Sequence, residues 1–163
     1  MTILYLHGLE SKLSDEKRVV LEQFGTVFAP DMDYKSNSEM YNYLMETYKN
    51  ESIDCIIGSS MGGFMGYHVA MRLGCPALLF NPALPIRSLN QNVPQNIVPK
   101  ENQRFSIVLG SQDETVPAIA NLNYFSENWL PTVQFQIKIR PDLAHQIPLN
   151  IFEEECRTFL RGF

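Results

Sequence analysis

Short apolar runs alternate along the chain with longer segments that have a helical pattern. The apolar runs are rich in β-branched and aromatic residues, as expected for buried strands, and they cover residues 3–6, 26–28, 53–57, 77–80, 105–109 and 133–139. Strands that alternate with helices build right-handed βαβ units. The pattern therefore predicts an α/β fold with a mostly parallel sheet of about six strands and helices on both faces.

The segments between these runs carry signals for the start and end of helices. Ser14 is an N-cap candidate, and Ser36 with Glu39 forms a capping box. Gly74 suits the left-handed end of one helix, and Pro117 suits the first turn of another. The predicted helices cover residues 15–24, 37–48, 61–73, 117–127 and 148–161. Residues 81–104 are rich in Pro and Asn, and we expect a loop or a minimal cap above the sheet.

Bulk composition narrows the class of protein. The chain has 163 residues, of which 45% are hydrophobic and 19% charged, so we expect one globular domain spanning residues 1–163. A net charge of −5 without a Lys- or Arg-rich run argues against a nucleic-acid partner. No segment has the roughly 18 apolar residues that would cross a membrane, and no signal peptide is visible. Three scattered cysteines are typical of reduced structural thiols. We therefore expect a cytoplasmic protein.

The most informative motif is Gly-Ser-Ser-Met-Gly at residues 58–62, between a predicted strand and a predicted helix. This G-x-S-x-G layout is typical of a nucleophile elbow, a tight turn that lifts a serine above a sheet. The spacing selects Ser60, because Gly58 and Gly62 stand two residues to either side of it. Ser59 would need glycines where Ile57 and Met61 stand. The alternative is a glycine-rich turn with a serine that has no catalytic role.

A catalytic serine needs a base and a residue that orients the base. Asp113 follows the fifth predicted strand, and His145 follows the last one. The carboxyl ends of parallel strands share one edge, so both side chains can meet Ser60 there. Glu114 and Asp142 are weaker candidates for the acid, since one would point elsewhere on its loop and the other suits a surface turn. The remaining histidines have other expected roles: His68 is a packing or surface residue on a helix, and His7 shapes a loop.

The oxyanion of an acyl-transfer reaction is usually held by two backbone N–H groups. We expect one from Met61, the residue after the nucleophile, and one from Leu9 in the loop after the first strand, with Glu10 as second choice. Substrate-pocket candidates are His7, Met32, Tyr34 and Phe64. At their spacings, Met and aromatic residues are also typical of an ordinary core.

These segments together resemble the α/β-hydrolase superfamily. The matching residues are Leu4-Tyr5-Leu6-His7-Gly8, the elbow, Gly110-x-x-Asp113-x-x-Val116-Pro117 and the late His145. The first segment, the Gly-Ser-Ser-x-Gly-Gly elbow and Phe80-Asn81-Pro82-Ala83 are similar to the small YqiA-type esterases. The resemblance implies a compact serine esterase without a cofactor. The sequence departs from the superfamily in two ways: it begins at what would be the third strand of the full fold, so we expect a sheet without the first two strands, and Leu143-Ala144 precedes His145, where the superfamily often has glycine.

Three function classes follow from these observations. The first is a serine hydrolase that cleaves small acyl esters, with thioester or peptide hydrolysis as variants of the same chemistry. The second is a catalytically silent binding or regulatory module of the same fold. The third, a nucleotide-binding protein, is disfavoured because the glycine motif matches neither G-x-G-x-x-G nor a P-loop. The histidines and cysteines share no metal-ligand spacing, so we expect no metal.

Overall fold

Six parallel strands form one sheet in the computed structural model, which describes residues 1–163. The strands are β1 (Thr2–Leu6), β2 (Thr26–Phe28), β3 (Cys55–Ser59), β4 (Ala77–Phe80), β5 (Gln103–Gly110) and β6 (Val133–Arg140), in the spatial order β2-β1-β3-β4-β5-β6. Every neighbouring pair is parallel. The predicted α/β class with about six strands is confirmed, and the sheet is entirely rather than mostly parallel.

The order of the strands reverses at β1, which lies between β2 and β3. The chain leaves β1 on one side to form β2 and returns on the other side to form β3. Such a reversal opens a crevice outside the carboxyl ends of the strands, where open α/β sheets bind ligands. Ser60 follows β3 directly, so the fold places it at this crevice.

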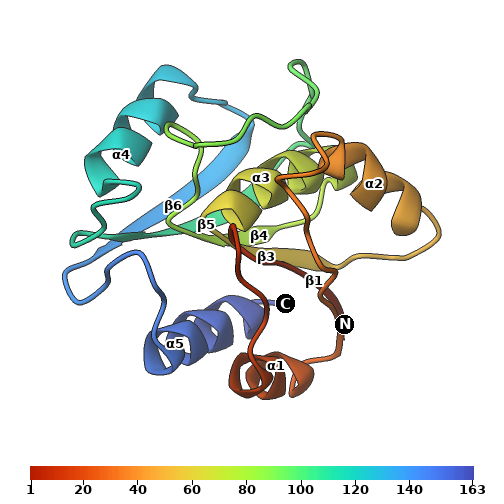
Figure 1. Ribbon diagram of the computed structural model, residues 1–163, viewed down its shortest axis with the longest axis horizontal. Helices are drawn as coiled ribbons and strands as arrows, with labels where there is room; N and C mark the ends of the chain where they lie inside the picture. Colours follow the sequence, from red (N-terminus) through yellow and green to blue (C-terminus); the bar gives the residue numbers. More distant parts are fainter.

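Helices cover both faces of the sheet, as Figure 1 shows. They are α1 (Asp15–Glu22), α2 (Met40–Thr47), α3 (Met61–Leu73), α4 (Ala118–Glu127) and α5 (Leu149–Leu160). In the view of Figure 1, α1 and α5 lie below the sheet, and α2, α3 and α4 lie above it. None of the helices is long and apolar enough to span a membrane.

Two hydrophobic cores fill the space between the sheet and its helices. Because successive side chains of a strand point to opposite faces, β1 contributes Leu4 and Leu6 to the core under α2, α3 and α4, and Ile3 and Tyr5 to the core under α1 and α5. The strands in the middle of the sheet are therefore apolar throughout, as expected for a parallel sheet covered on both sides. Cys55, Cys75 and Cys156 are buried and unpaired.

Two details of the predicted helix starts were wrong. The capping box at Ser36 and Glu39 does not open a helix, because α2 begins one turn later, at Met40. The Met40 N–H instead donates to Oε1 of Gln91, a buried side chain from the segment 81–102. The predicted starts at Pro117 and Pro148 are each one residue early, because these prolines precede α4 and α5. Ser14 caps α1 as predicted, and Gly74 ends α3 with a left-handed φ of 69°.

The start of α3 packs so closely on β1 that only glycine fits at residue 62. A Cβ on Gly62 would lie 2.0 Å from the carbonyl oxygen of Leu6, and one on Gly58 would lie 2.4 Å from the carbonyl oxygen of Gly62. Both contacts are with backbone, which cannot move aside as a flexible side chain can. The two glycines of the motif therefore allow α3 to start directly beside the sheet.

We predict that Gly62→Ala lowers the free energy of unfolding by ~3 kcal/mol or more, because the new methyl group forces the helix away from β1. Gly66→Ala is a matched control on the same helix. Its Cβ would meet side-chain atoms alone, those of Ile56 at 3.1 Å, Leu79 at 3.2 Å and Leu6 at 3.9 Å. We expect that change to stay within ~1 kcal/mol, since alanine also favours the helix. Urea unfolding followed by circular dichroism measures both, and equal losses would contradict the close-contact argument.

Candidate active site

Ser60 has a backbone conformation that non-glycine residues rarely adopt. Its φ is 53° and its ψ is −117°, and its side chain makes no capping hydrogen bond to α3. Such strain persists only where the surroundings fix it. Here the Ser60 N–H donates to the carbonyl of Phe80 at 2.9 Å, and the Ser60 carbonyl accepts from the N–H groups of Phe64 and Ala83 at 3.0 and 2.9 Å. The predicted elbow geometry is therefore present.

The loop after β1 packs directly against Ser60. A Cβ on Gly8 would lie 3.3 Å from Cβ and 3.9 Å from Oγ of Ser60. The next residue, Leu9, has an N–H without a backbone acceptor. The Met61 N–H belongs to the first residue of α3, where no intrahelical acceptor exists. Met61 and Leu9, the two residues predicted to form the oxyanion site, thus both have N–H groups without a backbone acceptor.

His145 lies beside a buried carboxylate. Its Nδ1 donates to Oδ2 of Asp113 at 2.8 Å, and the Asp113 side chain is completely buried while that of His145 is 29% exposed. The other oxygen of Asp113 accepts from the N–H groups of Thr115 and Val116, both at 2.8 Å. These bonds satisfy the buried carboxylate and fix its orientation. Nε2 of His145 remains free for a proton.

One cavity of about 620 Å³ connects these groups. Its lining includes Ser60, His145, Leu9 and Met61. Asp113 lies behind His145, outside the lining. The arrangement contains a serine hydroxyl, a histidine with a defined tautomer, a buried acid and two N–H donors at a single site, and this combination can carry acyl transfer.

Residues 2–115 match UPF0227, an uncharacterised protein family. The chain belongs to the UPF0227 family. The match includes the β1 loop, the elbow and Asp113, while His145 lies beyond its end.

Solved structures place this UPF0227 protein in the α/β-hydrolase fold. A hydrolase of the α/β superfamily from Xanthomonas campestris pv. campestris is 17% identical with a TM-score of 0.72, and the match covers 99% of this chain and 98% of that one. Esterase PE8 is 14% identical with a TM-score of 0.67, covering 99% of this chain and 91% of that one. Est1E from Butyrivibrio proteoclasticus is 16% identical with a TM-score of 0.66, covering 99% and 87%. The likeness at these identities concerns the fold.

The weaker acid candidates of this UPF0227 protein and His68 do not line the cavity. Glu114 is exposed, and Asp142 forms an ion pair with Arg140 at 2.9 Å. His68 packs on α3 against the rings of Phe64 and Tyr67. Burial, assisted by the nearby charge of Arg87, lowers the pKa of His68 to about 4. His68 is therefore a packing residue, as the sequence predicts.

The four predicted pocket residues do not line the cavity. Met32, Tyr34 and Phe64 are buried in the core, so they are ordinary core residues, which was the alternative interpretation of their spacing. His7 shapes the β1 loop, because its Nδ1 donates to the carbonyl of Gly8 at 2.7 Å and its Nε2 accepts from the Met32 N–H at 2.9 Å. These contacts support the loop that carries the Leu9 N–H.

Sequence reasoning assigned no role to Asn81, although this buried residue joins three loops at the edge of the sheet. Its Nδ2 donates to the carbonyl of Ala144 at 2.9 Å, and its Oδ1 accepts from the Gly110 N–H at 2.7 Å. Asn81 has a φ of 42°, which asparagine tolerates better than most residues. The sequence signal that could have indicated this role is the position of an asparagine directly after a buried strand. It holds the residue before His145 to the loop that carries Asp113.

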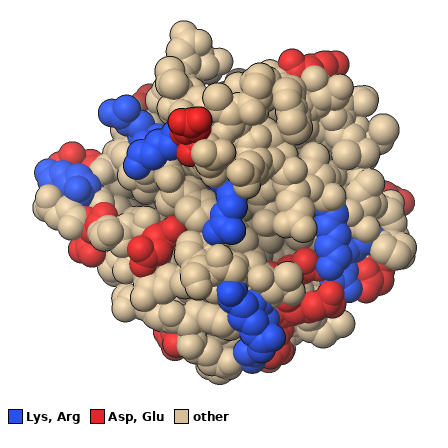
Figure 2. Space-filling model, turned by 180° about the vertical axis from the view of Figure 1, so that it is seen from behind, with Lys and Arg blue, Asp and Glu red and all other residues tan.

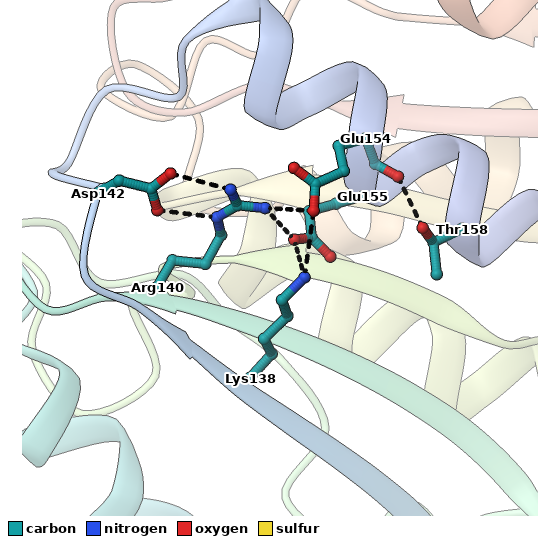
Figure 3. A network of polar contacts seen from close by, with 6 residues as sticks. All are labelled: Lys138, Arg140, Asp142, Glu154, Glu155 and Thr158. Atoms are coloured by element: carbon teal, nitrogen blue, oxygen red, sulfur yellow. Dashed lines mark hydrogen bonds and ion pairs between the residues drawn. The ribbon is translucent and has the colours of Figure 1, made fainter.

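Ion pairs anchor the far side of the His145 loop, as Figure 3 shows. Glu155 on α5 is buried, and its Oε1 accepts from Arg140 and Lys138 on β6, both at 2.6 Å. Arg140 also binds Asp142 through two nitrogens, at 3.0 and 2.9 Å. Hydrogen bonds to Asp142, Glu155 and Glu154 raise the pKa of Arg140 above its ordinary value. The network ties the first residues of the loop to β6 and α5.

We predict that Asn81→Ala lowers the free energy of unfolding by ~3 kcal/mol, since it leaves the Gly110 N–H and the Ala144 carbonyl without partners. Asn102→Ala is the control, because Asn102 is exposed and also has a positive φ of 60°. We expect that control to lose only ~1 kcal/mol, the cost of placing alanine in the left-handed region. Denaturant titration of both variants provides the comparison. If the two losses match, the side-chain bonds of Asn81 contribute nothing.

Proposed function

We propose that this protein is a serine hydrolase that cleaves small acyl esters through an acyl-enzyme intermediate. The observation that carries the proposal is the shared cavity of Ser60 and His145, with His145 bonded to the buried carboxylate of Asp113. In this proposal Ser60 is the nucleophile, His145 the general base and acid, and Asp113 the residue that orients the histidine.

Acylation begins when Nε2 of His145 takes the proton of the Ser60 hydroxyl. The Ser60 oxygen forms a bond to the carbonyl carbon of the ester, and the carbonyl electron pair moves to its oxygen. The N–H groups of Met61 and Leu9 donate to this oxyanion, and the α3 N-terminus favours its negative charge. The tetrahedral intermediate then collapses. His145 gives its proton to the departing alcohol oxygen, and the acyl group stays on Ser60.

Deacylation repeats these steps with water as the nucleophile. His145 takes a proton from the water, and the resulting hydroxide adds to the acyl carbon. The second tetrahedral intermediate releases Ser60, which recovers its proton from His145, and the carboxylic acid leaves. Throughout the cycle, Asp113 keeps the Nδ1–H of His145 directed at itself, so that Nε2 is the nitrogen that exchanges protons. Its negative charge stabilises the imidazolium that forms in both steps.

Three features support a small ester as the substrate. The cavity of about 620 Å³ falls within the range of small-molecule sites. The segment 81–102 contains no helix or strand that would form a large lid. Among proteins with the same fold, Est1E has been solved with ferulic acid bound, at 16% identity and a TM-score of 0.67. These features favour a compact ester over a long-chain lipid.

We predict that Ser60→Ala lowers kcat for 4-nitrophenyl acetate by roughly 10⁴-fold or more while the protein stays folded, because the attacking oxygen is gone. Ser59→Ala is the matched control, since Ser59 is adjacent and also lines the cavity. We expect it to retain activity. A fluorophosphonate probe should label the wild type and Ser59→Ala but not Ser60→Ala. Undiminished turnover in Ser60→Ala, or a folded wild type that is neither labelled nor active, would refute the assignment.

We predict that Asp113→Asn lowers kcat by roughly 10³- to 10⁴-fold, because an amide can no longer hold the Nδ1–H tautomer of His145. Glu114→Gln removes the same charge from the next residue and should change kcat less than about twofold, as expected for an exposed side chain distant from the reaction. Steady-state kinetics on the same ester measures both. A similar loss in the two variants would mean that Asp113 does not orient His145.

A further inference from the structure

The cavity around Ser60 is lined by more basic than acidic side chains, although the chain carries a net charge of −5. Lys12, Lys17 and Arg87 line it, and Glu10 is the one carboxylate in the lining. Glu10 forms an ion pair with Lys35, which lies outside the lining. The acidic charge in the lining is therefore already balanced.

None of the three lining cations forms an ion pair with a carboxylate. The Lys17 ammonium donates to the carbonyl of Ile147 at 2.7 Å, and Nη1 of Arg87 donates to the carbonyl of Leu84 at 3.0 Å. Lys138 and Arg140 on β6, by contrast, are both paired with carboxylates (Figure 3). On the face drawn in Figure 2, basic and acidic side chains lie mostly side by side. The cavity thus holds positive charge that the protein itself does not neutralise.

Lys17 is the best placed of the three for binding a ligand. It is half-buried in the first turn of α1, and its ammonium lies 5.2 Å from the centre of the Phe152 ring. Ile147, whose carbonyl holds it, comes two residues after His145. Burial lowers the pKa of Lys17 below its ordinary value. An ammonium has three donors, so two remain after the bond to Ile147, and a carboxylate has two oxygens to receive them.

Arg87 is a second cation in the lining, and it lies on the opposite face of the sheet from Lys17. Its guanidinium stacks 4.3 Å from the centre of the Phe64 ring, in the core beneath α3, whereas Lys17 contacts Phe152 in the core beneath α1 and α5. Ser60 stands between these layers, at the edge of the sheet. Lys17 and Arg87 therefore both line the cavity of Ser60, one from each face of the sheet.

We propose that the ester hydrolysed at Ser60 carries a carboxylate, and that Lys17 binds this carboxylate. The inference rests on the proposed function and adds a substrate class to it. A charge-assisted hydrogen bond in a half-buried site is stronger than one in open solvent. A neutral ester makes no such bond and leaves the ammonium with the Ile147 carbonyl alone.

Two pairs of esters test this inference, each differing by one carboxylate. For the acyl side, mono-4-nitrophenyl adipate is compared with 4-nitrophenyl hexanoate, which has the same six-carbon chain. For the alcohol side, 4-acetoxybenzoate is compared with its methyl ester. For each pair, the ratio of kcat/KM for the charged ester to that for the neutral ester is compared between wild type and variant. The intrinsic reactivity of the two esters is the same for both enzymes and cancels in this comparison.

We expect Lys17→Met to lower kcat/KM about tenfold for the charged member of one pair, the size typical of one charge-assisted hydrogen bond, and to change the neutral member little. Lys17→Arg keeps the charge and should restore most of the preference. Lys49→Met is the matched control: Lys49 does not line the cavity, and its replacement changes the net charge equally. It should leave both ratios unchanged.

Two results would overturn the inference while leaving the proposed function intact. One is an equal loss for charged and neutral esters in Lys17→Met, which would make Lys17 a residue that only positions Ile147 and the His145 loop. The other is that Lys17→Met leaves the preference for the charged ester unchanged in both pairs. If none of the four esters is hydrolysed in a Ser60-dependent manner, the proposed function itself fails, and this inference fails with it.

Discussion

The close approach of α3 to β1 is the constraint on which the rest of the site depends. Gly58 and Gly62 have no side chains to separate the helix from the sheet, and backbone atoms fill the space where a Cβ would lie. The short turn between β3 and α3 then leaves Ser60 no ordinary backbone conformation, and its φ is 53°. The same contact places the Ser60 side chain next to Gly8. One packing constraint thus produces the strained serine and brings the loop with the Leu9 N–H beside it.

The remaining site groups depend on hydrogen bonds between loops at the carboxyl edge of the sheet. Asn81 links the loop after β5 to the loop after β6, and the Gln112 N–H bonds to the carbonyl of Leu143 at 3.1 Å. The Arg140 network holds the other end of the His145 loop. A buried carboxylate such as Asp113 is stable only when its oxygens are satisfied, and these links keep its partners in place. The same hydrogen bonds that stabilise these loops therefore also orient His145.

The sequence predicted the fold well, and it also predicted that Ser60, Asp113 and His145 each follow a strand, because both kinds of signal are local. Apolar runs identify the strands, and each candidate residue directly follows a strand, so the parallel topology alone brings them to one edge. The start of α2 could not be predicted in this way. The capping box at Ser36 was a sound local signal, but Gln91, which lies far along the chain, bonds to the Met40 N–H. The role of Asn81 was missed for the same reason, since its partners lie in two other loops.

Local sequence patterns also could not predict which residues line the cavity, and these residues change the chemistry expected of the site. Met32, Tyr34 and Phe64 are apolar enough to form a pocket, yet their place in the core follows from packing that the sequence does not show. Lys17 looks like an ordinary lysine on the polar side of α1. It reaches the cavity because the His145 loop folds back over α1 and presents the Ile147 carbonyl to it. The net charge of the chain predicts nothing about this cavity, since recognition depends on which charges remain unpaired beside Ser60.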